Sequence, residues 1–193
     1  MAGGRQLKGP LPEFTVTDYE TAARILKHPG LMRELDWAVS IGSTVGPPAG
    51  FKEMSPKRKL RLTFDDIDRP TYMGYHPPNI RDIEAIVKFA RMADEGNVVI
   101  HCAAGQSRSS ATALLMIMSR MGVGNEEEAV RHLHRCVAEA AGKLLRPPVT
   151  PIHPNRLIVW LGDHYFGCGG ALWRALVKTM EPSYTMGFQM VPG

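Results

Sequence analysis

Cys102 and Arg108 are the two residues whose types and spacing most clearly suggest chemistry. A run of β-branched residues leads into the cysteine, a turn of small and polar residues follows, and the arginine precedes an apolar segment that ends at Met118. In an open α/β sheet, ligands bind beyond the carboxyl ends of the strands, and this pattern puts the cysteine at such an end. The sequence therefore predicts a ligand site at a junction of strand and helix.

The turn after the cysteine has the composition of an anion-binding site. Its residues are small enough for consecutive backbone N–H groups to point inward, and they open a helix whose N-terminal partial positive charge attracts anions. Arg108 can offer a planar pair of donors to a phosphate, and its charge favours the thiolate of Cys102. A thiolate in a phosphate cradle is a nucleophile for phosphoryl transfer. The expected phosphate-binding residues are Ala103, Ala104, Gly105, Gln106, Ser107 and Arg108.

The surrounding segments predict an α/β fold with a central, mostly parallel sheet flanked by helices. Apolar or alternating segments predict strands at 14–17, 37–43, 60–64 and 98–102. Helices are expected after the candidate N-caps Asp18, Asn79, Asn125 and Asn155, at 107–121, and around 172–177. Because 107–121 is apolar nearly all round, we expect this helix to be buried. The cysteine turn thus lies between a central strand and a buried helix.

Length and composition favour one globular domain. The chain has 193 residues, of which 44% are hydrophobic, enough for one core of ordinary size. We expect a disordered N-terminus at 1–12, a folded domain at 13–167, and a C-terminal helix and tail at 168–193. The formal charge of +4 is spread along the chain and does not predict nucleic-acid binding. Nothing in the composition indicates an oligomeric state.

The three cysteines are odd in number and irregular in spacing, so they predict free thiols rather than a disulfide framework or a zinc site. Cys136 and Cys168 are interpreted as buried small hydrophobic residues. No histidine has metal-ligand spacing, and no apolar run resembles a signal peptide or a membrane span. We expect a soluble cytoplasmic protein with no metal, membrane or nucleic-acid partner.

The segment HCAAGQSRS, from His101 to Ser109, resembles the H-C-x5-R-S/T signature loop of the cysteine-based protein tyrosine phosphatases. Its HCxxGxSRS form especially resembles the dual-specificity branch. The resemblance covers roughly Phe14 to Phe166, including PNRLIVWLGDHYF, where a Pro-Asn pair opens the last core helix and Asn155 is expected to support it as a cap. With RLTFDDIDRP, the chain is most similar to prokaryotic predicted protein tyrosine phosphatases. The domain at 13–167 is thus identified as a phosphatase domain.

The resemblance implies a role for each residue of the loop. Cys102 is the attacking thiolate and Arg108 the phosphate clamp. Ser109 donates to the sulfur as it leaves, His101 holds the loop and tunes the cysteine, and Gly105 lets the backbone approach the phosphate closely. The covalent phosphocysteine intermediate is then hydrolysed without a metal or other cofactor.

The resemblance also implies a general acid from an aspartate after the preceding strand, in the loop FDDIDRP. Asp66 aligns best with the dual-specificity pattern. Asp68 is the second choice, because a neighbouring Arg69 that holds it ionised would suit an acid poorly. Asp65 and then His76 follow. The segment RPTYMGYHPP lengthens this loop, and candidates for the pocket entrance are Tyr72, Tyr75 and His76.

Three functions compete at this point. The first is a phosphomonoester hydrolase acting on phosphotyrosine, with phosphoserine and phosphothreonine as further substrates. The second is a phosphatase for phosphoinositides, RNA 5′-phosphates or other non-protein esters, which is less favoured because Ala103 and Gln106 stand where lipid-directed relatives often carry lysines. The third is a catalytically silent phosphopeptide-binding module. It requires loss of the cysteine, the arginine or the acid, and the sequence has a candidate for each.

Overall fold

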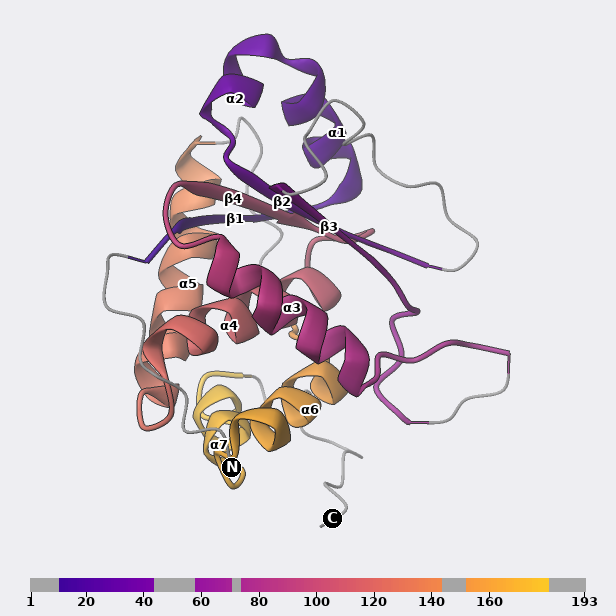
Figure 1. The fold of residues 1–193 in the computed structure, drawn as a ribbon, viewed down its shortest axis with the longest axis vertical. Coiled ribbons are helices and arrows are strands. Elements are labelled where there is room, and N and C mark those ends of the chain that lie inside the picture. Colours follow the sequence, from indigo (N-terminus) through magenta and orange to yellow (C-terminus); the bar gives the residue numbers. More distant parts are fainter. Residues whose placement is uncertain (1–10, 44–57, 71–73, 144–151, 181–193) are drawn as a thin grey trace.

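The computed structural model describes residues 11–43, 58–70, 74–143 and 152–180, with side chains up to residue 139 in the third of these ranges. Within them, four strands form one all-parallel sheet in the order β1-β4-β2-β3 (Figure 1). The strands are β1 (Glu13–Thr17), β2 (Trp37–Gly42), β3 (Lys59–Thr63) and β4 (Asn97–His101). This confirms the predicted fold class. Of the N-terminus expected to be disordered (1–12), residues 1–10 lie outside the described residues, as do Tyr72 and the tail beyond residue 180.

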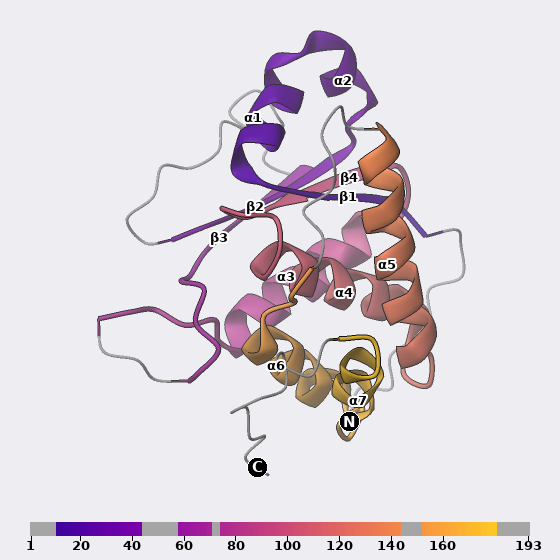
Figure 2. The same ribbon diagram turned by 180° about the vertical axis from the view of Figure 1, so that it is seen from behind.

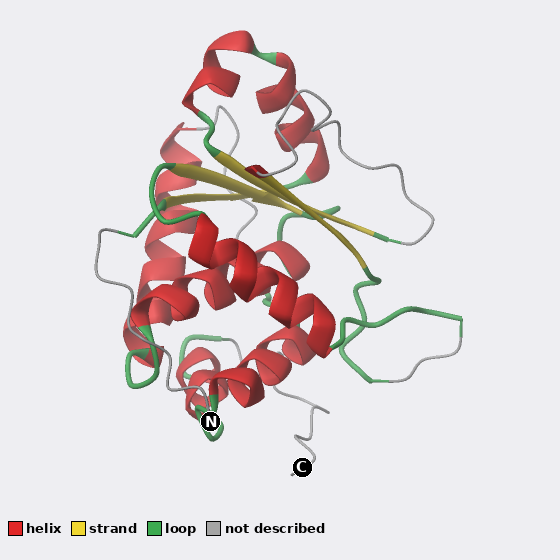
Figure 3. Cartoon of the chain, in the orientation of Figure 1, coloured by secondary structure: helices red, strands yellow, loops and turns green. Residues whose placement is uncertain are grey.

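Helices cover both faces of the sheet (Figure 3). On one face lie α1 (Tyr19–Lys27) and α2 (Pro29–Glu34). On the other lie α3 (Ile80–Met92), α4 (Arg108–Met121), α5 (Glu126–Lys143), α6 (Arg156–Phe166) and α7 (Ala171–Val177). The molecule is thus a three-layer α/β structure with most of its helices on one side.

Local hydrogen bonds explain where three of the helices begin. Asp18 accepts the N–H of Thr21 at 2.8 Å, and Asn155 accepts the N–H of Ile158 at 3.1 Å. Asn79 forms a reciprocal capping box with Asp82 at the start of α3. These three predicted caps are confirmed. The six-residue helix α2 was not predicted from the sequence, because it is short and has no buried side chain that would give it an apolar period.

The main core lies between the sheet and the larger helical layer. Helix α4 is buried along most of its length, as its all-round apolar sequence predicts. Leu172 and Leu176 of α7 are fully buried in the same core, so α7 is part of the same packed unit as the sheet. Figure 2 shows α5 beside β1, with which it is in contact. A smaller cluster under α1 fills the opposite face.

The connections that leave the carboxyl ends of β1 and β4 run to opposite faces of the sheet. These strands are neighbours, but the helix that follows β1 lies on one face of the sheet and the helix that follows β4 lies on the other (Figure 1). The two connections therefore diverge at this edge. Such a switch point is where open α/β sheets bind ligands, and Cys102 directly follows β4 there.

Candidate active site

The loop from Cys102 to Ser107 joins β4 to α4, and several of its carbonyl groups are held by other segments of the chain. Three of them accept backbone N–H groups from other segments: Ala103 from Tyr19 at 3.2 Å, Gln106 from His153 at 3.1 Å, and Ser107 from Asn155 at 3.1 Å. No backbone hydrogen bond in the described part of the chain uses the N–H groups of 103–108. Among the described residues, these amides therefore remain available to bind an anion.

Gly105 fits this loop closely against the start of α1. Its φ is +74°, in the left-handed region, and an added Cβ would lie 2.7 Å from the backbone nitrogen of Asp18 and from the carbonyl carbon of Thr17. Both facts require glycine. Gly105 therefore packs the loop against the β1–α1 junction. This is a second reason for glycine at this position, besides the close approach to phosphate expected from the sequence.

Cys102 lies at the base of the loop and is 1% exposed. Its Sγ is 3.2 Å from the Oγ of Ser109, which is also buried. The hydroxyl is within reach to donate a hydrogen bond to a thiolate. The structure thus brings together the predicted nucleophile and the hydroxyl expected to assist it.

Arg108 is 3% exposed and is fixed from two strand ends. Its Nη1 donates to the carbonyl oxygen of Phe64 at 3.0 Å and to Oγ of Ser43 at 3.4 Å. Neither acceptor was predicted as part of the site. The sequence could have indicated them through the topology, because Ser43 and Phe64 follow β2 and β3, and parallel strands end at one edge of the sheet.

Asp66 is brought over the same loop from the segment after β3. Its Oδ1 accepts hydrogen bonds from Oγ of Ser107 at 2.6 Å and from Nδ2 of Asn155 at 2.9 Å. Its Oδ2 is 3.7 Å from Nε of Arg108. The side chain remains 41% exposed, so it can meet a molecule that enters from solvent. Of the three aspartates that follow β3, Asp66 is the one that makes these contacts with the cysteine loop.

The other candidates for the acid have structural partners elsewhere. Asp65 is buried and accepts the backbone N–H of His76 at 2.9 Å, which closes the base of the loop between them. Asp68 forms an ion pair with Arg156 at the start of α6. The arginine in contact with Asp68 thus comes from a helix far along the chain, in addition to the sequence neighbour Arg69 considered above. His76 is exposed.

His101 lies under the loop on the α1 face of the sheet. It is almost fully buried, and its ring makes an edge contact with Tyr19 at a centroid distance of 5.9 Å. Burial lowers the pKa of His101 to about 4, and the nearby charges of Arg61 and Arg108 act in the same direction. The imidazole is therefore neutral near pH 7. The Tyr19 contact was not predicted.

The remaining cysteines have no part in the loop. Cys136 is buried, and burial raises the pKa of its thiol. Burial is also the largest cause that raises the pKa of Cys168 to about 12, and Glu126 acts in the same direction. Both thiols stay protonated near neutral pH. Cys136 thus agrees with the interpretation as a buried small hydrophobic residue, whereas Cys168 differs from it because the side chain is only partly buried.

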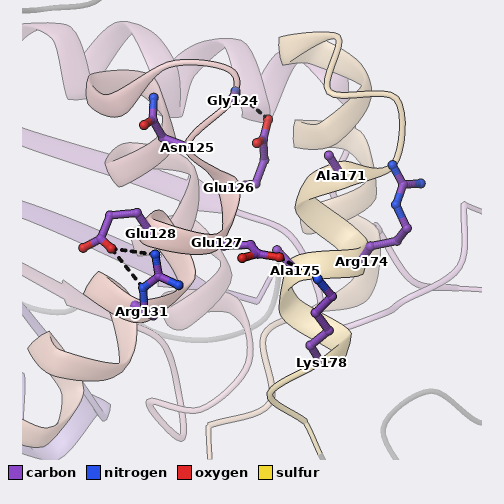
Figure 4. A pocket seen from close by; sticks show the side chains of 10 residues that line it. All are labelled: Gly124, Asn125, Glu126, Glu127, Glu128, Arg131, Ala171, Arg174, Ala175 and Lys178. Carbon is purple, nitrogen blue, oxygen red and sulfur yellow. Dashed lines mark hydrogen bonds and ion pairs between the residues drawn. The ribbon is translucent and has the colours of Figure 1, made fainter.

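A cavity of about 490 Å³ lies away from this site, between the start of α5 and α7 (Figure 4). Three glutamates and three basic residues line it, and several of them pair with one another. Glu128 binds Arg131 at 2.9 Å, and the buried Glu126 accepts the N–H of Gly124 at 3.0 Å. None of the lining residues belongs to the cysteine loop or to the Asp66 segment.

No helix in the described part of the chain is both long and apolar enough to cross a membrane. Within the same residues, no group of three or more His, Cys, Asp or Glu side chains is arranged to hold a metal ion.

No protein-family model matches the sequence, and no curated protein matches it significantly. Solved structures do resemble it. The human tyrosine phosphatase-like serine/threonine/tyrosine-interacting protein is 21% identical, with a TM-score of 0.55 over 86% of this chain and 100% of that one. DUSP15 is 16% identical, with a TM-score of 0.50 over 91% of this chain and 97% of that one. The chain therefore has a protein tyrosine phosphatase-like fold.

Proposed function

We propose that this protein is a phosphomonoester hydrolase, a protein tyrosine phosphatase of the dual-specificity type that works through a phosphocysteine at Cys102. The observation that carries the proposal is the convergence of three groups on one loop. The sulfur of Cys102 lies beside the hydroxyl of Ser109. Arg108 follows the loop directly, and Asp66, from the segment after β3, contacts both Ser107 of the loop and Arg108. These are a nucleophile, a clamp and a proton donor for ester cleavage.

The first chemical step forms the covalent intermediate. The substrate phosphate binds the amides of 103–108, which donate no backbone hydrogen bond within the described part of the chain, and Arg108 neutralises its charge. The Cys102 thiolate attacks phosphorus, and the bond between phosphorus and the ester oxygen breaks. Asp66 gives a proton to that oxygen as it leaves, so the product is a neutral alcohol or phenol.

The second step returns the enzyme to its starting state. Water attacks phosphorus and Asp66, now a carboxylate, takes a proton from it. The bond between sulfur and phosphorus breaks, and its electron pair returns to Cys102. Ser109, 3.2 Å from the sulfur, donates a hydrogen bond to the thiolate that forms.

Phosphotyrosine is the proposed substrate class, with phosphoserine and phosphothreonine as further substrates. The loop closed by Asp65 and His76 carries an exposed Tyr75 that can contact an aromatic substrate at the entrance. We place the chain near the prokaryotic members of the superfamily on the motif RLTFDDIDRP. We propose a cytoplasmic location, where reducing conditions keep Cys102 a thiol.

The test is hydrolysis of p-nitrophenyl phosphate by the purified protein in the presence of a metal chelator. We expect turnover by the wild type, none by Cys102→Ser, and retained vanadate binding by that variant, because the amides and Arg108 remain. Cys168→Ser is the matched control and should keep wild-type rates. Full activity in Cys102→Ser would contradict the mechanism. Vanadate binding without wild-type turnover would favour the silent binding module.

The same wild-type preparation separates the substrate classes. Phosphopeptides, a phosphoinositide and a 5′-phosphorylated RNA are compared by kcat/KM. We expect phosphotyrosine peptides to be preferred. A higher kcat/KM for the lipid or the RNA would move the assignment to a non-protein phosphatase and leave the cysteine mechanism intact.

A further inference from the structure

The two oxygens of the Asp66 carboxylate have different surroundings. Oδ1 accepts two hydrogen bonds, from Oγ of Ser107 at 2.6 Å and from Nδ2 of Asn155 at 2.9 Å. Oδ2 has only the guanidinium of Arg108 near it, with Nε at 3.7 Å, among the polar contacts of the described residues. The carboxylate is therefore anchored through one oxygen.

Asn155 is itself held on several sides. It is 4% exposed, its Oδ1 accepts the N–H of Ile158 at 3.1 Å, and its backbone N–H donates to the carbonyl of Ser107 at 3.1 Å. The same Nδ2 that reaches Asp66 also lies 3.3 Å from the carbonyl oxygen of Ile67. One side chain thus joins the start of α6, the cysteine loop and the Asp66 segment, and it has little freedom to move.

We propose that Ser107 and Asn155 are positioning residues for the general acid, and that they assign the two oxygens of Asp66 different tasks. Oδ1 is the anchor, and Oδ2 carries the proton that goes to the leaving group. This inference rests on the proposed phosphatase function.

Hydrogen-bond capacity supports the assignment. A carboxylate oxygen offers two lone pairs in the carboxyl plane, and two donors already occupy Oδ1. A proton on Oδ1 would displace a donor, so the acid form of Asp66 carries its proton on Oδ2. When the ester bond breaks, that proton moves to the leaving oxygen, and the two donors stabilise the carboxylate that remains. In the second step, Oδ2 takes a proton from the attacking water.

Two variants test the positioning role independently. Ser107→Ala removes one donor. Asn155→Asp replaces the other donor by a carboxylate oxygen that repels Oδ1 of Asp66, and it keeps an oxygen to accept the N–H of Ile158, so the cap of α6 is retained. The measurement is kcat/KM for a series of aryl phosphates from good to poor leaving groups. We expect each variant to lose about tenfold on the poorest leaving group and less than about threefold on the best, because only a poor leaving group depends strongly on the acid.

The same substitutions in an Asp66→Asn background give the decisive comparison. If both donors act through Asp66, neither substitution should lower the rate further when the acid is already absent. Additive losses in that background would contradict the inference, as would equal losses on good and poor leaving groups. Ser107→Thr keeps the hydroxyl, so this variant should show the same dependence of kcat/KM on the leaving group as the wild type.

Asn125→Asp, before α5, is the matched control for an Asn-to-Asp change and should leave the leaving-group dependence unaltered. Urea unfolding of every variant shows which are folded. If Asn155→Asp does not fold, Ser107→Ala and Ser107→Thr still decide the question. An inactive wild type would contradict the proposed function itself, which distinguishes that failure from a failure of the positioning role.

Discussion

Three carboxylates within four positions of the chain have three different surroundings. Asp65 is buried and bonded to the backbone of its own loop, Asp68 is paired with Arg156, and Asp66 is bonded to the cysteine loop while remaining partly exposed. A general acid must reach the leaving group and solvent, so only the third environment suits the task. Asp66 is thus the proposed acid because of its contacts, since its residue type is the same as that of Asp65 and Asp68.

Asp66→Asn and Asp68→Asn should therefore differ in kind. We expect Asp66→Asn to lower kcat for poor leaving groups by about a hundredfold, since general acid catalysis contributes roughly that much, and to affect good leaving groups far less. Asp68→Asn should lower kcat less than about threefold, because it loses a partly exposed ion pair worth about 1 kcal/mol or less. Steady-state kinetics on the aryl phosphate series measure both. The reverse order would assign the acid to Asp68.

At the scale of elements, the cysteine loop keeps its shape because three segments hold it. The β1–α1 junction binds the carbonyl of Ala103, the segment before α6 binds those of Gln106 and Ser107, and Ser110 of α4 bonds to the same two carbonyls. These bonds fix the peptide orientation before any ligand arrives. Preorganised amides of this kind avoid the cost of reorientation during the reaction.

Gly105→Ala should disturb the shape of the cysteine loop more than the strain of a left-handed backbone conformation alone would do. Its φ of +74° and the 2.7 Å approach of a Cβ to the backbone at Thr17 and Asp18 both oppose the change. We expect vanadate affinity and kcat/KM to fall by about tenfold or more. Vanadate titration and steady-state kinetics measure the two losses.

Gly124→Ala is the matched control, because Gly124 has a φ of +93° but open space around an added Cβ. It should lose about 1 kcal/mol of stability through backbone strain and keep both vanadate affinity and rate. If Gly105→Ala also kept them, the packing of the loop on the β1–α1 junction would not matter for anion binding.

At the scale of the whole molecule, the four strands and the buried α4 could be predicted from the sequence because each has a clear apolar pattern. The strand order β1-β4-β2-β3 could not, since a period of two does not say which strands are neighbours. Nor could the bond between Asn155 and Asp66, which are 89 positions apart and have no shared local pattern. The loop was predictable because its residues are contiguous, and the proposed acid was less so because it is singled out by tertiary contacts.

Global stability should show a signature of the buried His101. Burial lowers its pKa from 6.5 to about 4, so between these values the unfolded chain binds a proton that the folded chain does not. This contribution to stability is complete above about pH 6.5 and decreases as the pH falls towards 4, by a total on the order of 3 kcal/mol.

His101→Gln should remove that pH dependence. The free energy of unfolding in urea is measured at pH 7 and pH 4.5 for the wild type, for this variant and for His164→Gln, an exposed-histidine control. We expect the wild type and the control to lose more stability on acidification than His101→Gln loses. Equal losses in all three proteins would show that His101 is not the buried neutral histidine described above.

The most direct test of the central claim is to trap the intermediate. The wild type and Asp66→Asn are mixed with an aryl phosphate that has a good leaving group, quenched in acid within milliseconds, digested and analysed by mass spectrometry. We expect one phosphoryl group on the peptide that contains Cys102, at a higher level in Asp66→Asn because that variant lacks the proposed base that activates water. Turnover with no phosphoryl group on that cysteine at any time point would contradict it.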